Sequence, residues 1–202
     1  MNWAKIYYIS QGKTTEEHLA NISDVVEAGC KFVQLRLKGV SEEDYTKAGI
    51  KAQQICAVKN ALLFINDNIQ VAKNCNADGV HLGLTDERPA KAREVLSKGK
   101  LVGGTANTLE HCLQLINEGV DYIGLGPYRY TTTKKNLSPV LGLEGFENIK
   151  NELVKRGDLT PIYAIGGIEK VDFESIYNIG INGIAVSGIL SNKSKNELAA
   201  VL

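Results

Sequence analysis

The segment Phe32-Val33-Gln34-Leu35-Arg36-Leu37-Lys38 alternates strictly between apolar and polar side chains. Residues two apart share one face of a β-strand, so the pattern predicts a strand with Gln34, Arg36 and Lys38 together on its polar face. If helices cover the outside of the sheet, that polar face points inward. Buried cations are costly unless an anion and hydrogen bonds compensate for them, so the segment predicts a pocket for a strongly negative ligand.

Short β-type runs bounded by turn residues recur along the chain, and helix-type stretches lie between them. The predicted strands are Lys5–Ser10, Phe32–Leu37, Leu62–Ile65, Gly79–Leu82, Leu101–Gly104, Tyr122–Gly126, Pro161–Ile165 and Gly183–Val186. The predicted helices are Thr15–Ala28, Glu42–Val58, Ile69–Cys75, Ala90–Ser97, Leu109–Glu118, Leu143–Lys155, Phe173–Asn178 and Lys195–Leu202. Gly29, Gly119 and Gly180 stand where helix C-cap glycines are expected. Eight alternations favour a single-domain α/β fold, a (β/α)8 TIM barrel over residues 1–202, rather than an open doubly wound sheet.

Composition restricts the partners. Lysine plus arginine and aspartate plus glutamate both number 23 in 202 residues, so no overall field draws the chain to nucleic acid or to an anionic membrane. No run of about eighteen apolar residues and no signal segment is evident, which predicts a cytoplasmic protein. Cysteines are few and widely spaced, and we expect them to be buried free thiols: Cys30, Cys56, Cys75 and Cys112.

Two aspartates are metal candidates at the expected strand ends. Magnesium (Mg2+) prefers a pair of carboxylates and completes its octahedral shell with water and phosphate oxygens, which Asp67 and Asp86 fit. Arg36, Lys38 and Lys134 against these aspartates leave about +1, magnesium raises this to about +3, and a diphosphate ester brings about −3. In the alternative interpretation, Asp67 caps the following helix and Asp86 begins a turn.

A second anion site is predicted after the last two strands. Ile165-Gly166-Gly167-Ile168 and Val186-Ser187-Gly188-Ile189 occupy the loops that usually hold phosphate in a TIM barrel, and glycines let backbone N–H groups approach an anion. Thr131 and Thr133 offer hydroxyl donors, or they belong to a threonine-rich surface loop.

The histidines are less informative. His81, at the end of its strand, either shapes a ring-binding pocket or is a satisfied, half-buried residue. His18 and His111 fall in helical stretches and are expected at the surface. No arrangement of side chains suggests a covalent nucleophile or a zinc site.

The motifs as an ordered set resemble the thiamine phosphate synthase family almost end to end. They are Gln34-x-Arg36-x-Lys38, Asn66-Asp67, Ala77-Asp78-Gly79-Val80-His81-Leu82-Gly83, Asp86, Gly103-x-Thr105, Asp121-Tyr122-Ile123-Gly124-x-Gly126-Pro127, Thr131-x-Thr133-Lys134, Ala164-Ile165-Gly166-Gly167-Ile168 and Ala185-Val186-Ser187. The resemblance implies a magnesium-dependent barrel transferase. Such an enzyme joins the diphosphate ester of 4-amino-5-hydroxymethyl-2-methylpyrimidine to the phosphate of 4-methyl-5-hydroxyethylthiazole and releases diphosphate and thiamine phosphate.

The resemblance also implies residue roles and partners. Carried over by position, the pyrimidine falls on Gln34, its diphosphate on Arg36, Lys38, Asn66, Thr105 and Lys134, magnesium on Asp67 and Asp86, and the thiazole phosphate on Thr131, Thr133, Gly167 and Ser187-Gly188. Arg36, Lys38 and Lys134 are the expected catalytic residues, acting on the leaving group without a general base. The partners are these two small molecules, and the family implies a homodimer.

The chain departs from the family pattern at three places. Leu84 stands where the family usually has a glutamine, and Thr85 stands where it commonly has an acidic residue. Tyr128-Arg129-Tyr130 stands where the family has an apolar pair followed by a small residue or proline. Gly188 aligns with a serine of the family. Two other functions therefore stay open, namely a thiazole tautomerase of the related barrel family and a non-catalytic, regulatory binding barrel. A phosphosugar isomerase on this fold needs a base that the sequence does not place.

Overall fold

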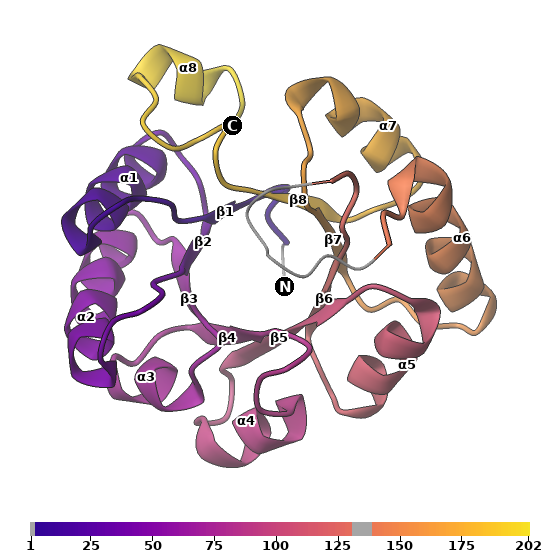
Figure 1. Cartoon of the computed structure of the whole chain (residues 1–202), viewed down its shortest axis with the longest axis horizontal. Helices are drawn as coiled ribbons and strands as arrows, with labels where there is room; N and C mark the ends of the chain where they lie inside the picture. Colours follow the sequence, from indigo (N-terminus) through magenta and orange to yellow (C-terminus); the bar gives the residue numbers. More distant parts are fainter. Residues whose placement is uncertain (1–2, 131–138) are drawn as a thin grey trace.

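The computed structural model describes residues 3–130 and 139–202, and in them eight parallel strands close into a barrel in chain order (Figure 1). Its strands are β1 (Ile6–Ile9), β2 (Phe32–Leu35), β3 (Leu62–Asn66), β4 (Gly79–Leu82), β5 (Leu101–Ala106), β6 (Tyr122–Leu125), β7 (Ile162–Ile165) and β8 (Gly183–Val186). Strand β1 pairs with both β2 and β8, which closes the ring. The predicted fold class, a (β/α)8 barrel, is confirmed.

Helices surround the strands on the outside of the barrel (Figure 1). They are α1 (Thr15–Glu27), α2 (Glu42–Val58), α3 (Ile69–Asn74), α4 (Pro89–Val95), α5 (Leu109–Asn117), α6 (Gly142–Lys155), α7 (Phe173–Asn178) and α8 (Lys195–Ala199), with a 3-10 turn η1 (Lys170–Asp172) before α7. Hydroxyl caps start several of them, as when Thr14 accepts from the Glu17 amide at 3.2 Å. Gly29 has φ +111° beyond α1, in agreement with its predicted capping role.

Strand β2 ends at Leu35, earlier than the alternating pattern predicted. The Leu35 carbonyl accepts the Tyr45 hydroxyl at 2.7 Å, and the Arg36 amide donates to the Ser10 hydroxyl at 3.0 Å, so side chains replace the ladder partners at this point. Arg36 and Lys38 therefore follow the strand at the rim, and the expectation of buried cations is wrong for Lys38, whose side chain is 58% exposed. Gln34 does lie inside, where it is 2% exposed.

Aromatic rings fill the barrel interior towards the start of the strands. The interior cluster is made of Tyr7, Phe32, Phe64, Leu101, Tyr122, Tyr163 and Ala185, with Trp3 packed against it. Glycines on neighbouring strands leave the rings their space, since a Cβ on Gly103 would lie 2.1 Å from Cζ of Tyr122. Large and small residues alternate, as close packing of a small barrel requires.

A second apolar cluster lies between the outer faces of the strands and the helices. All four cysteines are buried and free, as predicted. Burial raises the pKa of the Cys30 thiol to about 11, which suits a packing role. None of the described helices has the length and apolar character that crossing a membrane would need.

Candidate functional site

The predicted site residues within the described ranges gather at the carboxyl ends of neighbouring strands. Gln34 lies on β2, Asn66 ends β3 and Thr105 lies on β5, and all of them are buried. Arg36 and Lys38 follow β2, Asp67 follows β3 and Asp86 follows β4. Because parallel strands of a barrel end at one rim, residues far apart in sequence meet there.

Asp67 and Asp86 form a close carboxylate pair. The Gly83 amide donates to Oδ2 of Asp86 at 2.6 Å, and a Cβ on Gly83 would lie 2.7 Å from that oxygen and 3.8 Å from Oδ1 of Asp67. Burial and the neighbouring Asp67 carboxylate raise the pKa of Asp86 to about 6. Burial alone would raise the pKa of Asp67, but the hydrogen bond with Asp86 and the Lys38 ammonium hold its pKa below the ordinary value. The pair thus repels itself when both members are ionised.

The alternative interpretation gave Asp67 a helix-capping role and Asp86 a role in a turn, and the structure excludes the first of these. The cap of α3 is Asn68, whose side chain accepts from the Val71 amide at 2.8 Å, so Asp67 does not cap that helix. Asp67 has φ +66°, a left-handed conformation that is rare for residues other than glycine. Asp86 belongs to a turn but ends it instead of beginning it, since its amide donates to the Gly83 carbonyl at 3.2 Å.

The donor set suits a hard divalent cation. Two carboxylates, one of whose pKa values is kept high by burial and by repulsion from its partner, provide oxygen ligands and a negative charge that a cation would neutralise. Within residues 3–130 and 139–202, no group of three or more histidine, cysteine or acidic side chains comes together in an arrangement that could hold a metal ion, so this site offers a cation two carboxylates and no further ligand of these types. Magnesium fits a site of two aspartates because it keeps several positions for water and phosphate oxygens.

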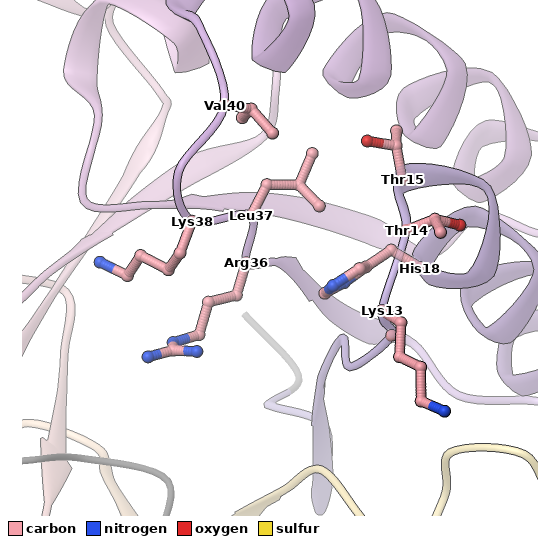
Figure 2. A pocket seen from close by; sticks show the side chains of 9 residues that line it. Lys13, Thr14, Thr15, His18, Arg36, Leu37, Lys38 and Val40 are labelled. Carbon is pink, nitrogen blue, oxygen red and sulfur yellow. The ribbon is translucent and has the colours of Figure 1, made fainter.

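Cations border the carboxylate pair. Lys38 forms an ion pair with Asp67, although the lysine side chain is 58% exposed. Arg36 and Lys38 also line a pocket of about 170 Å3 with Lys13 and Thr14 of the β1–α1 loop and His18 of α1. Figure 2 shows the side chains of Arg36 and Lys38 extending to the same side. Positive charge is therefore concentrated at the rim on the β1–β2 side.

Two histidines have structural partners. His18 is only 8% exposed and its Nδ1 lies 2.7 Å from the Ser10 hydroxyl, so the expectation of a surface position is wrong. His81 is 6% exposed, more buried than the half-buried alternative, and its hydrogen bonds agree with the interpretation of a satisfied residue. Its Nδ1 lies 3.2 Å from the Tyr122 hydroxyl and its Nε2 lies 3.0 Å from the Thr105 hydroxyl.

The predicted second anion site is partly described. Gly167 has φ +68°, and its carbonyl accepts from the Arg129 guanidinium at 2.8 Å. Ser187 and Gly188 follow β8 close to Gln11, whose Oε1 accepts from the Ser187 hydroxyl at 3.2 Å. Both glycine-bearing loops thus lie at the carboxyl ends of β7 and β8. Three predicted residues fall outside the described ranges: Thr131, Thr133 and Lys134.

Arg129, which the sequence marked only as a departure, ties two loops together. Its guanidinium donates two hydrogen bonds to the Asp172 carboxylate, at 2.6 and 2.8 Å, in addition to the bond with Gly167. Asp172 is 5% exposed, and the Arg129 guanidinium holds its pKa below the ordinary value. Tyr128 packs edge-on against Phe146. The unusual loop residues thus anchor the segment after β6 to the loop after β7.

Comparison with known proteins identifies the chain. The family model for thiamine monophosphate synthase matches residues 6–190, which is most of the sequence. The chain belongs to the thiamine monophosphate synthase family. A thiamine-phosphate synthase of Flavobacterium psychrophilum is 47% identical over 197 residues, covering 98% of this chain and 95% of the relative. One of Flavobacterium johnsoniae is 42% identical, covering 96% of this chain and 92% of the relative.

The structures agree with the sequences. A thiamine phosphate pyrophosphorylase from Pyrococcus furiosus superimposes with a TM-score of 0.85 at 27% identity, covering 99% of this chain and 94% of that one. A 3-hexulose-6-phosphate synthase with a TM-score of 0.73 is only 14% identical and shares the fold alone. For a member of the thiamine monophosphate synthase family, the rim of acidic and basic side chains lies where an α/β barrel places its working residues.

Proposed function

We propose that the protein is a thiamine phosphate synthase, which condenses hydroxymethylpyrimidine diphosphate with hydroxyethylthiazole phosphate. The bond between the pyrimidine methylene carbon and the diphosphate oxygen breaks, a bond between that carbon and the thiazole nitrogen forms, and diphosphate leaves with its electron pair. The observation that carries the proposal is the joint presence of Asp67, Asp86, Arg36 and Lys38 at one end of the barrel in a chain of this family.

Stabilising the leaving group is the main task assigned to this site. Arg36 and Lys38 concentrate positive charge next to the carboxylate pair, and we assign Lys134, Asn66 and Thr105 to the same diphosphate. Charge that develops on a leaving diphosphate in the transition state is stabilised most strongly by cations already held in place. Magnesium held by Asp67 and Asp86 would withdraw further charge from the diphosphate.

Orientation of the two substrates is the second task. We assign the pyrimidine ring to Gln34, and the thiazole phosphate to the backbones of Gly167 and Ser187-Gly188 with Thr131 and Thr133. Loops after the seventh and eighth strands commonly bind phosphate in this fold, and a positive φ at Gly167 permits close backbone approach. Holding both substrates in one site replaces a bimolecular encounter with a positioned reaction.

No general base is required in this proposal. The electron-rich aminopyrimidine stabilises positive charge at its methylene carbon, so departure of diphosphate precedes capture by the thiazole nitrogen. The nitrogen carries a lone pair and no proton that has to be removed. A site made of cations, hydrogen-bond donors and a metal-binding pair is sufficient for such a dissociative substitution.

Two other functions make different demands. A thiazole tautomerase has no diphosphate to bind, which leaves the grouping of Arg36, Lys38, Asp67 and Asp86 unexplained. A regulatory barrel would bind both ligands without turnover.

Because both substrates carry phosphate and do not cross membranes unaided, we expect the protein to act in the cytoplasm. We also expect a homodimer, as the family implies.

The test is an assay of diphosphate release with both substrates, with and without magnesium. We expect formation of thiamine phosphate that depends on the metal, and losses of turnover of about two orders of magnitude or more in Asp67→Ala and Lys134→Ala. The matched control is Glu87→Ala, which removes an exposed carboxylate one residue from Asp86 and should retain activity. Tight binding of both substrates without product would establish the regulatory alternative, and near-normal turnover in either variant would refute the assigned roles.

A further inference from the structure

A chain of hydrogen bonds crosses the barrel interior from Gln34 to Thr105. The Gln34 amide nitrogen donates to the Tyr7 hydroxyl at 2.9 Å, and that hydroxyl lies 3.0 Å from the hydroxyl of Tyr122. The Tyr122 hydroxyl lies 3.2 Å from Nδ1 of His81, and Nε2 of His81 lies 3.0 Å from the Thr105 hydroxyl. All five side chains are buried, at 7% exposure or less. The two ends of the chain are residues that we assign to the pyrimidine and to its diphosphate.

With a neutral imidazole, the hydrogen bonds of this series can all donate towards Thr105 or all donate towards Gln34, because each hydroxyl has one hydrogen. If the Gln34 nitrogen donates to Tyr7, then Tyr7 donates to Tyr122 and Tyr122 donates to Nδ1 of His81. A neutral imidazole then carries its proton on Nε2 and donates to Thr105. Burial raises the pKa of both tyrosines, so their hydroxyls keep their hydrogens at neutral pH.

We propose that Tyr7, Tyr122 and His81 are positioning residues that fix the direction of every hydrogen bond along this chain. They thereby hold Gln34 with its carbonyl oxygen as the acceptor for the ligand, and they leave the hydroxyl hydrogen of Thr105 as a donor. This inference rests on the proposed function. A 4-aminopyrimidine offers an N–H donor to the carbonyl oxygen, and a diphosphate oxygen accepts from the hydroxyl, so the fixed pattern matches both parts of one substrate.

The same pattern discriminates against a 4-oxopyrimidine. An oxo group would meet the Gln34 carbonyl oxygen, so two acceptors would face each other. Relief would require the amide to turn over, and the bond to Tyr7 opposes this rotation. Sites that hydrogen-bond a substrate group strongly reject an analogue that cannot form that bond, because a buried polar group then stays unpaired. Selectivity for the amino group would thus depend on Tyr7 and on the residues that continue its series of hydrogen bonds.

The first test reads the polarity of the chain without substrate. In protein labelled with 15N at histidine, the tautomer of His81 is measured by long-range 1H–15N NMR at a pH where the ring is neutral. We expect the proton on Nε2, with Nδ1 as an acceptor. A proton on Nδ1 would mean that the chain runs in the opposite direction and would overturn the proposal. This measurement needs no turnover, so it decides the polarity even if the proposed reaction fails.

The second test measures selectivity in a variant that keeps the ring and removes one hydroxyl. For Tyr7→Phe we expect the ratio of kcat/KM for the amino over the oxo pyrimidine diphosphate to fall about tenfold, which corresponds to about 1.4 kcal/mol. The KM for the thiazole phosphate should not change, whereas general loosening of the fold would alter both substrates.

The matched control is Tyr163→Phe. Tyr163 belongs to the same interior cluster, but its hydroxyl donates to the Ala4 carbonyl at 2.7 Å and lies outside the chain of hydrogen bonds. Its selectivity ratio should stay within twofold of the wild type. If Tyr7→Phe does not fold, Tyr122→Phe breaks the next link and is expected to lower the ratio in the same way. An unchanged ratio in the folded variant, or an equal fall in Tyr163→Phe, would refute the proposal.

Discussion

Substituting Asp86 by asparagine should stabilise the metal-free protein. Asparagine keeps an oxygen that can accept from the Gly83 amide, now at 2.6 Å from Asp86, and it removes the repulsion between two carboxylates. The pKa of Asp86 is about 6 in the folded protein, against about 3.9 for an ordinary aspartate in an unfolded chain. Ionised Asp86 therefore costs folding free energy at neutral pH.

The size of the effect follows from this difference. Two pKa units correspond to about 3 kcal/mol, and solvent screening of a partly exposed side chain reduces this to about 1–2 kcal/mol. For a protein of this length, that gain raises Tm by about 2–8 °C. The sign depends on pH, because a raised pKa places the full cost above pH 6 and removes it as Asp86 becomes protonated. The difference between variant and wild type should thus be largest near pH 8 and vanish near pH 4.

The assay is thermal unfolding in a chelator, followed by circular dichroism across this pH range. Glu87→Gln serves as the control because it removes one negative charge from an exposed neighbour, and its Tm should stay close to that of the wild type. Addition of magnesium with diphosphate should raise the Tm of the wild type and leave that of Asp86→Asn nearly unchanged. A variant that is less stable than the wild type at pH 8 would show that the two carboxylates do not repel each other as the structure indicates.

Three further substitutions test other parts of the barrel. Arg129→Gln, which removes the paired bonds to Asp172, should raise the KM for the thiazole phosphate by a factor on the order of 10 in steady-state kinetics. The KM for the pyrimidine diphosphate should stay unchanged, and equal changes in the two KM values would contradict a local role. Gly103→Ala should lower the free energy of unfolding by about 1–3 kcal/mol in urea titrations, because its Cβ meets the ring of Tyr122, and wild-type stability would show that the ring moves freely. Tyr45→Phe, which removes the one hydroxyl hydrogen shared by the carbonyls of Leu35 and Asn66 at the ends of β2 and β3, should cost about 1–2 kcal/mol in the same titrations, and a smaller loss would mean that water replaces the hydroxyl.

The barrel and its rim were predictable because both depend on local periodicity and on topology. Alternating residues such as Val33 and Gln34 define a strand, and the repeated alternation of strands and helices implies a parallel barrel with one working end. Asp67 and Asp86 could be placed together at that end without coordinates. The motifs resemble those of one family, and the match to its model over residues 6–190 confirms this resemblance. The roles of individual site residues remain predictions.

Features that depend on side chains meeting across the fold were not predictable. Strand β2 ends at Leu35 because the hydroxyls of Ser10 and Tyr45 replace its ladder partners, and no periodicity records such a contact. The bond between the hydroxyls of Tyr7 and Tyr122 joins residues 115 positions apart. Arg129 reaches Asp172 across 43 positions, although a charge in an otherwise apolar family position is a signal that indicates an acidic partner.

The cluster of rings at the start of the strands affects where substrates enter and products leave the barrel. Trp3 packs against Phe32, Tyr122 and Tyr163, and these rings obstruct the amino-terminal end of the barrel. We therefore expect substrates to arrive, and products to depart, at the opposite end of the barrel, where Arg36 and Lys38 line a pocket. A product that still occupies this end would exclude the next pair of substrates, so we expect the release of the last product to limit turnover.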